Sequence, residues 1–189
     1  DLSTNQLSGP IPKEIGSMTA LNKLDFSYNQ LESIPSTLSG LSILSHMYLS
    51  YNELSGPIPD TIGSLTSLTT LGLRSNKLSG VIPPSIGLLK NINVLDLSYN
   101  QLSGPIPTEI GSMVALIKLD LSDNQLSGNI PAAIGALIQM KFLDLSDNKL
   151  SGNIPTTLEA LIQMEYLELS ANQLSDMPST LFALSRMSY

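Results

Sequence analysis

The residues of this chain that could do chemistry are carboxylates that recur at a fixed interval. Asp96, Asp120 and Asp144 are 24 residues apart, and each stands between two leucines of a Leu-Asp-Leu-Ser stretch. Carboxylates about 5 Å apart would raise one another's pKa and attract a cation, and retaining glycosidases use a pair at a similar separation. The serine after each aspartate, together with Lys118, can stabilise such a row without a metal. No insertion that could form a pocket interrupts the spacing.

Histidine and cysteine offer no alternative centre. His46 is the only histidine, and the chain has no cysteine. A lone imidazole is a poor metal ligand or catalytic base, so we expect His46 to be a partly exposed surface residue. Because no nucleophile, base and orienting group converge, we predict a protein that is not an enzyme and that has no metal site and no cofactor.

The elements that position these residues follow from an internal repeat. Asparagine recurs in steps of 24, 23, 24, 24, 24, 24 and 24 residues, at positions 5, 29, 52, 76, 100, 124, 148 and 172. Self-similarity at this period is typical of repeat architectures. The asparagine follows a short stretch such as Leu95-Asp96-Leu97, whose period of two predicts a strand with leucine inward and aspartate outward.

One such strand per repeat builds a parallel sheet on the concave face of a solenoid. The segment Leu102 to Pro107 contains a glycine and two prolines that forbid a regular helix. Residues such as 109–116 then return across the convex face as a short 3₁₀ or helical turn. We therefore predict an α/β solenoid, a right-handed superhelix of about eight repeats of 23–24 residues. The repeated asparagines should satisfy backbone groups of neighbouring turns and form a structural ladder: Asn29, Asn52, Asn76, Asn100, Asn124, Asn148 and Asn172.

A six-residue block, Leu-Ser-Gly-x-Ile-Pro, recurs at 7–12, 54–59, 78–83, 102–107, 126–131 and 150–155. With these blocks the chain resembles plant-type leucine-rich-repeat proteins, such as receptor-like kinase ectodomains and polygalacturonase-inhibitor proteins, over essentially its whole length. The resemblance implies a leucine-rich-repeat fold and a binding function, since that family binds peptides, steroids, co-receptors and enzymes on one scaffold. The segments Leu31 to Pro35 and Leu174 to Pro178 drop a residue and the glycine. We expect them to interrupt a uniform second strand along the solenoid.

Exposed positions of the concave sheet depart from the repeat in two places. The column between the two strand leucines holds Tyr48 and Gly72 where most repeats have aspartate, and Arg74 replaces a serine. Further along, aromatic residues on consecutive strands are flanked by Asp123, Asp144, Asp147 and Glu168. Tyrosine and arginine often anchor binding energy at interfaces. The candidate ligand-binding residues are Tyr28, His46, Tyr48, Tyr51, Arg74, Phe142 and Tyr166. Drift on a solvated face is the alternative explanation.

Charge and composition limit the classes of partner and the cellular locations that fit this chain. Nine basic against sixteen acidic residues give a net charge of -7, which disfavours nucleic acid and anionic membrane surfaces. We expect a protein or peptide partner, possibly a basic one. The family resemblance implies an extracellular or cell-surface location. However, the sequence has no signal peptide, no cysteine and no Asn-x-Ser/Thr sequon, so an intracellular scaffold is an alternative.

The ends suggest a single repeat domain, 1–189, that is an uncapped fragment of a longer protein. The chain starts inside a strand at Asp1 to Ser3 and stops at 184–189 on the approach to another, whereas solenoids need terminal caps. The methionines, Met18 and Met187 among them, are expected to fill the core. A third functional alternative is ice binding, which some plant-type repeat proteins perform, although the exposed concave columns are charged and irregular.

Overall fold

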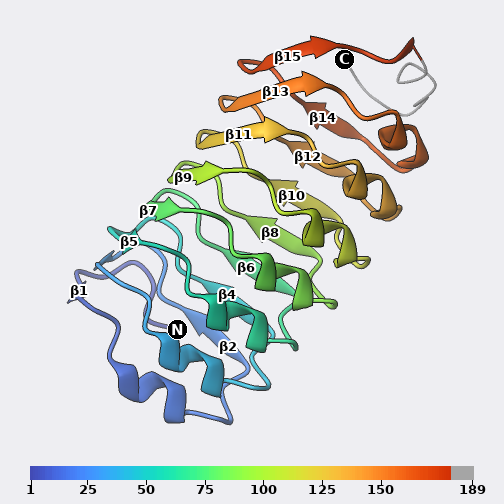
Figure 1. Cartoon of the computed structure of the whole chain (residues 1–189). Coiled ribbons are helices and arrows are strands. Elements are labelled where there is room, and N and C mark those ends of the chain that lie inside the picture. Colours follow the sequence, from blue (N-terminus) through green and yellow to red (C-terminus); the bar gives the residue numbers. More distant parts are fainter. Residues whose placement is uncertain (180–189) are drawn as a thin grey trace.

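The computed structural model describes residues 1–179, which form a curved stack of similar coils (Figure 1). One strand of each coil joins a parallel seven-stranded sheet on the concave face, in the order β14-β12-β10-β8-β6-β4-β2. Its strands are β2 (Lys23–Asp25), β4 (His46–Tyr48), β6 (Thr70–Gly72), β8 (Val94–Asp96), β10 (Lys118–Asp120), β12 (Phe142–Asp144) and β14 (Tyr166–Glu168). The register pairs equivalent repeat positions, so that Asp96, Asp120 and Asp144 are direct neighbours. The predicted leucine-rich-repeat solenoid is confirmed.

A second set of strands follows the asparagine of each repeat. They are β1 (Ser8–Gly9), β3 (Gln30–Leu31), β5 (Ser55–Gly56), β7 (Lys77–Gly80), β9 (Gln101–Gly104), β11 (Gln125–Asn129), β13 (Lys149–Asn153) and β15 (Gln173–Asp176). β1 pairs with β3 alone, and a separate six-stranded parallel sheet has the order β15-β13-β11-β9-β7-β5. The pairing breaks after β3, in the first shortened repeat, and the register shifts between Gly152 and Asn153, opposite the second. The first short repeat thus interrupts this sheet as expected, whereas the second stays paired and only shifts the register.

The return segments are 3₁₀ helices of five residues each, and they stack on the convex side. They are η1 (Lys13–Ser17), η2 (Ser36–Gly40), η3 (Asp60–Ser64), η4 (Pro84–Leu88), η5 (Thr108–Ser112), η6 (Ala132–Ala136) and η7 (Thr156–Ala160). A proline precedes each one in an extended conformation, which explains the sharp start. No helix among residues 1–179 is long and apolar enough to cross a membrane.

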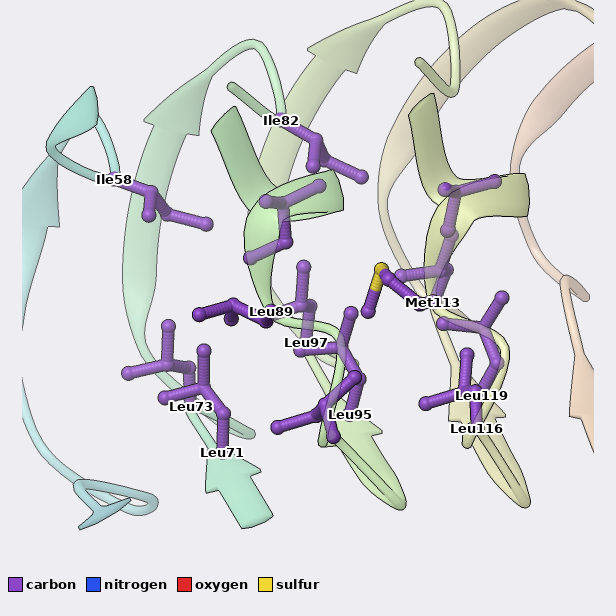
Figure 2. Close-up of a cluster of buried hydrophobic side chains, with 14 of the residues drawn as sticks. Ile58, Leu71, Leu73, Ile82, Leu89, Leu95, Leu97, Met113, Leu116 and Leu119 are labelled. Carbon is purple, nitrogen blue, oxygen red and sulfur yellow. The ribbon is translucent and has the colours of Figure 1, made fainter. Parts of the chain in front are cut away.

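Each coil contributes a layer of leucine and isoleucine to one continuous core (Figure 2). In the coil of β8, Leu95 and Leu97 from the concave strand meet Ile106 and Ile110 from the convex side, and all four are buried. Because every repeat places the same side chains inward, neighbouring layers pack directly on one another. The core therefore extends along the whole stack.

The asparagine ladder holds the turns together as predicted. The Nδ2 group of Asn100 donates to the carbonyl oxygen of Leu73 in the preceding coil at 3.0 Å and to that of Leu97 in its own turn at 3.1 Å. Its Oδ1 accepts the backbone N–H of Leu78 at 3.0 Å. The same pattern recurs along the stack, at Asn29, Asn52, Asn76, Asn124, Asn148 and Asn172. Each amide thereby bonds its own turn to the coil before it.

Some sequence-based expectations need correction at the ends of the stack. The first repeat adds no strand to the concave sheet, although Leu2 N donates to Asp25 O at 2.8 Å. The sheet therefore has seven strands, not eight, and spans about 29 Å. Met18 and Met177 are half exposed, and Met18 lies in the first coil of the described stack. Met18 lines an open apolar hollow of about 580 Å³. Met187 and the expected approach at 184–189 lie outside the described residues.

Candidate functional site

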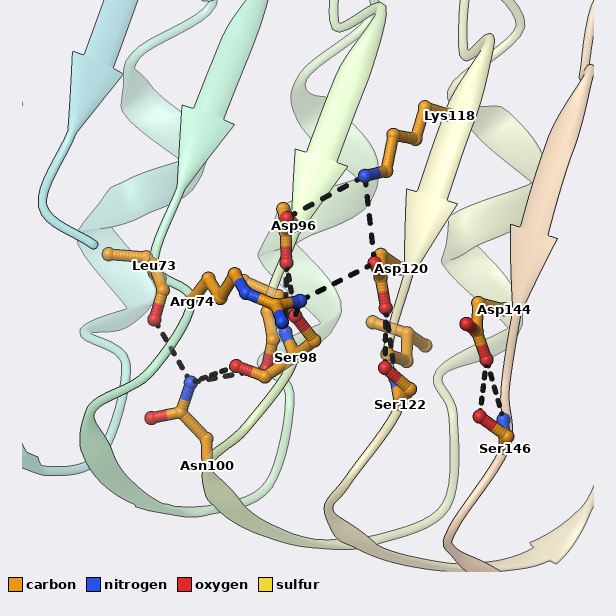
Figure 3. Close-up of polar contacts among 12 residues, drawn as sticks. Leu73, Arg74, Asp96, Ser98, Asn100, Lys118, Asp120, Ser122, Asp144 and Ser146 are labelled. Carbon is orange, nitrogen blue, oxygen red and sulfur yellow. Dashed lines mark hydrogen bonds and ion pairs between the residues drawn. The ribbon is translucent and has the colours of Figure 1, made fainter. Parts of the chain in front are cut away.

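Serine and lysine side chains of the concave sheet compensate the charges of the aspartate row, which consists of Asp96, Asp120 and Asp144 with the equivalent acidic residues Asp25 and Glu168. Asp96 accepts a hydrogen bond from Ser98 Oγ at 2.6 Å, and the equivalent serines donate to Asp120 and Asp144 in the same way (Figure 3). Lys118 Nζ lies between Asp96 Oδ2, at 3.8 Å, and Asp120 Oδ2, at 3.6 Å. Within residues 1–179, no group of three or more His, Cys, Asp and Glu side chains is arranged to hold a metal ion. The serines and Lys118 stabilise the row as predicted.

The pKa values along the row depend on the burial and hydrogen bonds of each carboxylate. Burial raises the pKa of Asp25, but hydrogen bonds from Ser27 and the nearby Lys23 outweigh burial and hold that pKa below its ordinary value. On β12, burial and then the charges of Asp120 and Glu168 raise the pKa of Asp144, despite its hydrogen bonds from Ser146. On β14, hydrogen bonds from Ser170 lower the pKa of Glu168.

A first cluster forms around Arg74, at the end of β6. Its Nε donates to Tyr51 Oη at 3.2 Å, and its Nη1 donates to Ser98 Oγ at 2.8 Å. The guanidinium carbon lies 4.3 Å from the ring centroid of Tyr99. On the other side, Tyr51 stacks on Tyr28 with centroids 4.4 Å apart and 9° between the planes. Four flat groups from four consecutive repeats thus form a continuous row of contacts, which we call the arginine cluster: Tyr28, Tyr51, Arg74 and Tyr99.

The tyrosines of this cluster occupy strained backbone positions. Tyr28, Tyr51 and Tyr99 have φ of 56°, 57° and 55°, in the left-handed region that asparagine, aspartate and glycine tolerate best. The equivalent residues Asp123 and Asp147 share this conformation. Ser75 and Ala171 share it as well, so the turn before each ladder asparagine imposes this conformation whatever the side chain.

Tyr48 and His46 lie beside the arginine cluster on β4. Their ring centroids are 6.2 Å apart, and Lys23 Nζ lies 5.3 Å from the Tyr48 centroid. Gly72 lies opposite Tyr48 in the register, and a Cβ added there would lie 3.2 Å from Ser50 Oγ and in ordinary contact, at 3.6 Å, with Tyr48 Cδ1. His46 Nδ1 and Ser45 Oγ share a hydrogen bond of 2.7 Å. His46 is half-buried, as the sequence predicted.

A second cluster combines two aromatic rings with carboxylates. Phe142 on β12 and Tyr166 on β14 are register partners, and their rings stack with centroids 4.4 Å apart and 3° between the planes. Lys118 Nζ lies 4.7 Å from the Phe142 centroid, on the side of β10. Burial raises the pKa of the Tyr166 hydroxyl, and so do the charges of Asp144, Glu168 and Asp120. We call Phe142 and Tyr166 the acidic aromatic cluster.

The structure thus groups the candidate residues into two sites. Tyr51 contacts both Tyr28 and Arg74, and His46 lies near Tyr48 on β4, whereas Phe142 and Tyr166 form a separate pair. Three strand spacings separate β6 from β12 in the sheet order, or about 14 Å. The sequence reasoning did not include Tyr99 among the candidates, although Tyr99 stands in the same repeat position as Tyr28 and Tyr51.

Sequence models described as "Leucine rich repeat" match residues 1–54, 19–78, 66–126 and 139–161. A search of curated proteins found no significant match. Among solved structures, a TDR receptor superposes with a TM-score of 0.96 at 33% identity, over 98% of this chain and 32% of that one. The ectodomain of the Arabidopsis receptor kinase HAESA, in complex with an N-terminally extended IDA peptide hormone, gives 0.91 at 43% identity over 96% and 31%.

A plant ice-binding protein superposes with a TM-score of 0.83 at 36% identity, over 92% of this chain and 56% of that one. This chain spans about a third of the two receptor chains. The repeat models cover most of the chain, and the similar structures share its coil geometry. The chain belongs to the leucine-rich-repeat family, in its plant-type form.

Proposed function

We propose that this chain is a recognition module that binds a peptide or protein along its concave sheet and catalyses no reaction. The observation that carries the proposal is the pair of exposed aromatic clusters, each joined to a cation, at the places where the concave columns depart from the repeat. Rigid aromatic and arginine side chains are the usual anchors of interface binding energy. The ligand residues are then Tyr28, His46, Tyr48, Tyr51, Arg74, Phe142 and Tyr166, with Tyr99 added.

Arg74 would bind an acidic group of the ligand. A guanidinium has five N–H donors, and two of them are used by Tyr51 and Ser98, which leaves three without a hydrogen-bond partner within residues 1–179. The stack on Tyr99 fixes the plane of the group. Glycine at position 72 removes the carboxylate that most other strands carry there, although Arg74 Nη1 also lies 4.0 Å from Asp120 Oδ2, with which an incoming anion would compete.

The acidic aromatic cluster would bind a basic residue of the ligand. Phe142 and Tyr166 offer ring surface for a cation–π contact, and Asp144 and Glu168 lie on the same two strands. Three to four strand spacings separate this cluster from Arg74, so an extended ligand would bridge the two sites with about four to six residues. A peptide with one acidic and one basic anchor at that separation fits both sites.

The comparisons support a ligand-binding role outside the cell. The HAESA structure is a receptor kinase ectodomain with a bound peptide hormone, and the TDR structure is a receptor. We infer by similarity that this chain also acts extracellularly or at the cell surface. An intracellular scaffold is the alternative, and detection of the secreted protein in the medium of expressing cells would exclude it.

Selection from a displayed random-peptide library tests the proposal. Wild-type protein should enrich peptides with an acidic group and a Lys or Arg about four to six residues away. Arg74→Ala should lose the preference for the acidic group, whereas Lys77→Ala, which removes an exposed lysine on the second sheet, should keep it. Failure to enrich any peptide, or equal selection by Arg74→Ala, would contradict the proposal.

Ice binding is a second candidate, favoured by the similarity to a plant ice-binding protein. The second sheet provides a regular surface that the concave columns lack, because one serine per strand recurs on six neighbouring strands: Ser55, Ser79, Ser103, Ser127, Ser151 and Ser175. The exposed Lys77 and Lys149 flank this row and make it less uniform. Thermal hysteresis that Ser127→Tyr abolishes would support this function, and the absence of ice shaping would exclude it.

A further inference from the structure

A row of exposed apolar side chains runs along one edge of the stack, outside the concave sheet. Val114, Ile138 and Ile162 are 53%, 58% and 71% exposed. Each is the second residue after a 3₁₀ helix, in the loop that leads to the next concave strand. Earlier repeats place polar residues at this position, such as Thr19, Thr66 and Lys90. The apolar edge is therefore confined to three consecutive repeats.

One pair of opposite charges lies in the same loops. Lys141 and Glu165 each precede a concave strand by one residue, and their side chains form an ion pair of 2.9 Å. Both side chains are about half exposed. Two consecutive loops, 137–141 and 161–165, thus carry an isoleucine and a charge each, with opposite signs.

We propose that two copies of this chain associate edge to edge about a twofold axis between these two loops. In such an interface the same surface meets itself, so that each contact occurs twice. Ile138 of one copy would pack against the partner's Ile162, and Lys141 would face the partner's Glu165. The pattern is self-complementary only with the axis between the loops, because an axis through loop 137–141 would bring Lys141 against the partner's Lys141.

The association is weak and independent of the ligand site. Ile138 and Ile162 of each copy form the centre of a small apolar area, and Val114 lies one coil farther from the axis. Such an area is below the roughly 1,200 Å² that a standard specific interface buries. The row lies in the connecting loops, so the arginine cluster and the ligand that we propose for it are not needed for pairing. Dimers should form in the range from about 10 μM to about 1 mM.

Sedimentation equilibrium of the 189-residue chain over that range tests the proposal. The average mass should rise above 20.2 kDa toward twice that value, and Ile138→Ser/Ile162→Ser should remain monomeric with unchanged circular dichroism. Leu88→Ser is the matched control, because Leu88 is equally exposed at 56% but lies on η4. A wild-type monomer throughout, association of the double variant through the open apolar hollow, or equal loss in Leu88→Ser would overturn the proposal.

Exchange of the charges distinguishes this twofold interface from general stickiness. Lys141→Glu places like charges opposite each other, as does Glu165→Lys, so each variant alone should stay monomeric. Mixed in equal amounts, the two variants restore opposite charges at both contacts and should form a heterodimer. If the mixture stays monomeric, or if either variant alone dimerises like wild type, the axis is wrong.

Discussion

Removal of one ladder amide should destabilise the whole stack. Asn124 Nδ2 donates to the carbonyl oxygens of Leu97, Leu121 and Ser122 at 3.0, 3.2 and 3.1 Å. Its Oδ1 accepts the backbone N–H of Leu102 at 2.9 Å. Leu97 and Leu102 belong to the preceding coil, so this single side chain bonds two neighbouring coils together.

The size of the effect follows from the groups left unpaired. Asn124→Leu keeps the branched shape of the side chain but leaves the buried N–H of Leu102 without an acceptor, which costs about 1–3 kcal/mol. The lost hydrogen bonds to carbonyl oxygens add about 0.5–1.5 kcal/mol each, and Leu97 O keeps a bond from Asn100. We expect a total loss of about 3–5 kcal/mol in the free energy of unfolding.

Urea unfolding followed by far-ultraviolet circular dichroism measures this loss. Asn5→Leu is the matched control, because Asn5 is exposed and bonds only to Leu2 O and Ser3 O of its own turn. That control should lose less than about 1 kcal/mol. If Asn124→Leu loses no more than Asn5→Leu, the ladder does not hold the coils together and the reasoning is refuted.

Three further predictions concern packing, strain and pH. Gly111→Ala should lower stability by about 1–3 kcal/mol in urea unfolding, because its Cβ would lie 2.5 Å from the carbonyl oxygen of Ala133; an unchanged midpoint would contradict this packing. Ala171→Asn should raise stability by about 1 kcal/mol, since its φ of 52° suits asparagine better; a loss measured by thermal unfolding would show that strain is absent. The third prediction uses unfolding free energies from pH 2 to pH 7. Asp144 has a raised pKa in the folded state, so its charge opposes folding above the ordinary value of 3.8, and Asp144→Asn should stabilise the protein at pH 7 with a gain that disappears as the pH falls below 3.8. Asp25 has a lowered pKa, so its charge favours folding; Asp25→Asn should destabilise at pH 7, and the difference should vanish as the pH falls through the folded-state pKa. The same sign for both variants at pH 7 would contradict the electrostatic description.

The sequence predicted the coils well because their chemistry repeats. Leucine at every second strand position has one structural explanation, a strand with one face buried. Asparagine at the end of every strand also has one, a ladder between coils. The period and the residue types together therefore predict the strands, the ladder and the register. The pairing of Phe142 with Tyr166 follows from this register and is confirmed. The neutralisation of Asp96 and Asp120 by serine and Lys118 could likewise be predicted from spacing.

The remaining features of the candidate site and of the stack depend on side-chain conformations and on packing at the ends of the stack. The repeat period determines neither. Arg74 reaches across one strand to Ser98 and stacks on Tyr99, and this contact depends on its rotamer. Met18 occupies a core position of the repeat, yet it is half exposed because its coil is the first of the described stack. The apolar edge with Ile138 was also not predicted, since a loop position accepts polar and apolar residues alike.

Binding of a selected peptide to variants of the two faces tests the central claim most directly. Isothermal titration should show that Tyr48→Ala/Arg74→Ala/Phe142→Ala/Tyr166→Ala weakens binding by at least about 30-fold, the loss expected for one interface hot spot. Val81→Ser/Leu88→Ser, which changes two exposed apolar residues away from the concave sheet, should bind like wild type. Unchanged affinity in the fourfold variant, with a loss in the Val81/Leu88 variant, would place recognition outside the concave sheet and contradict the account.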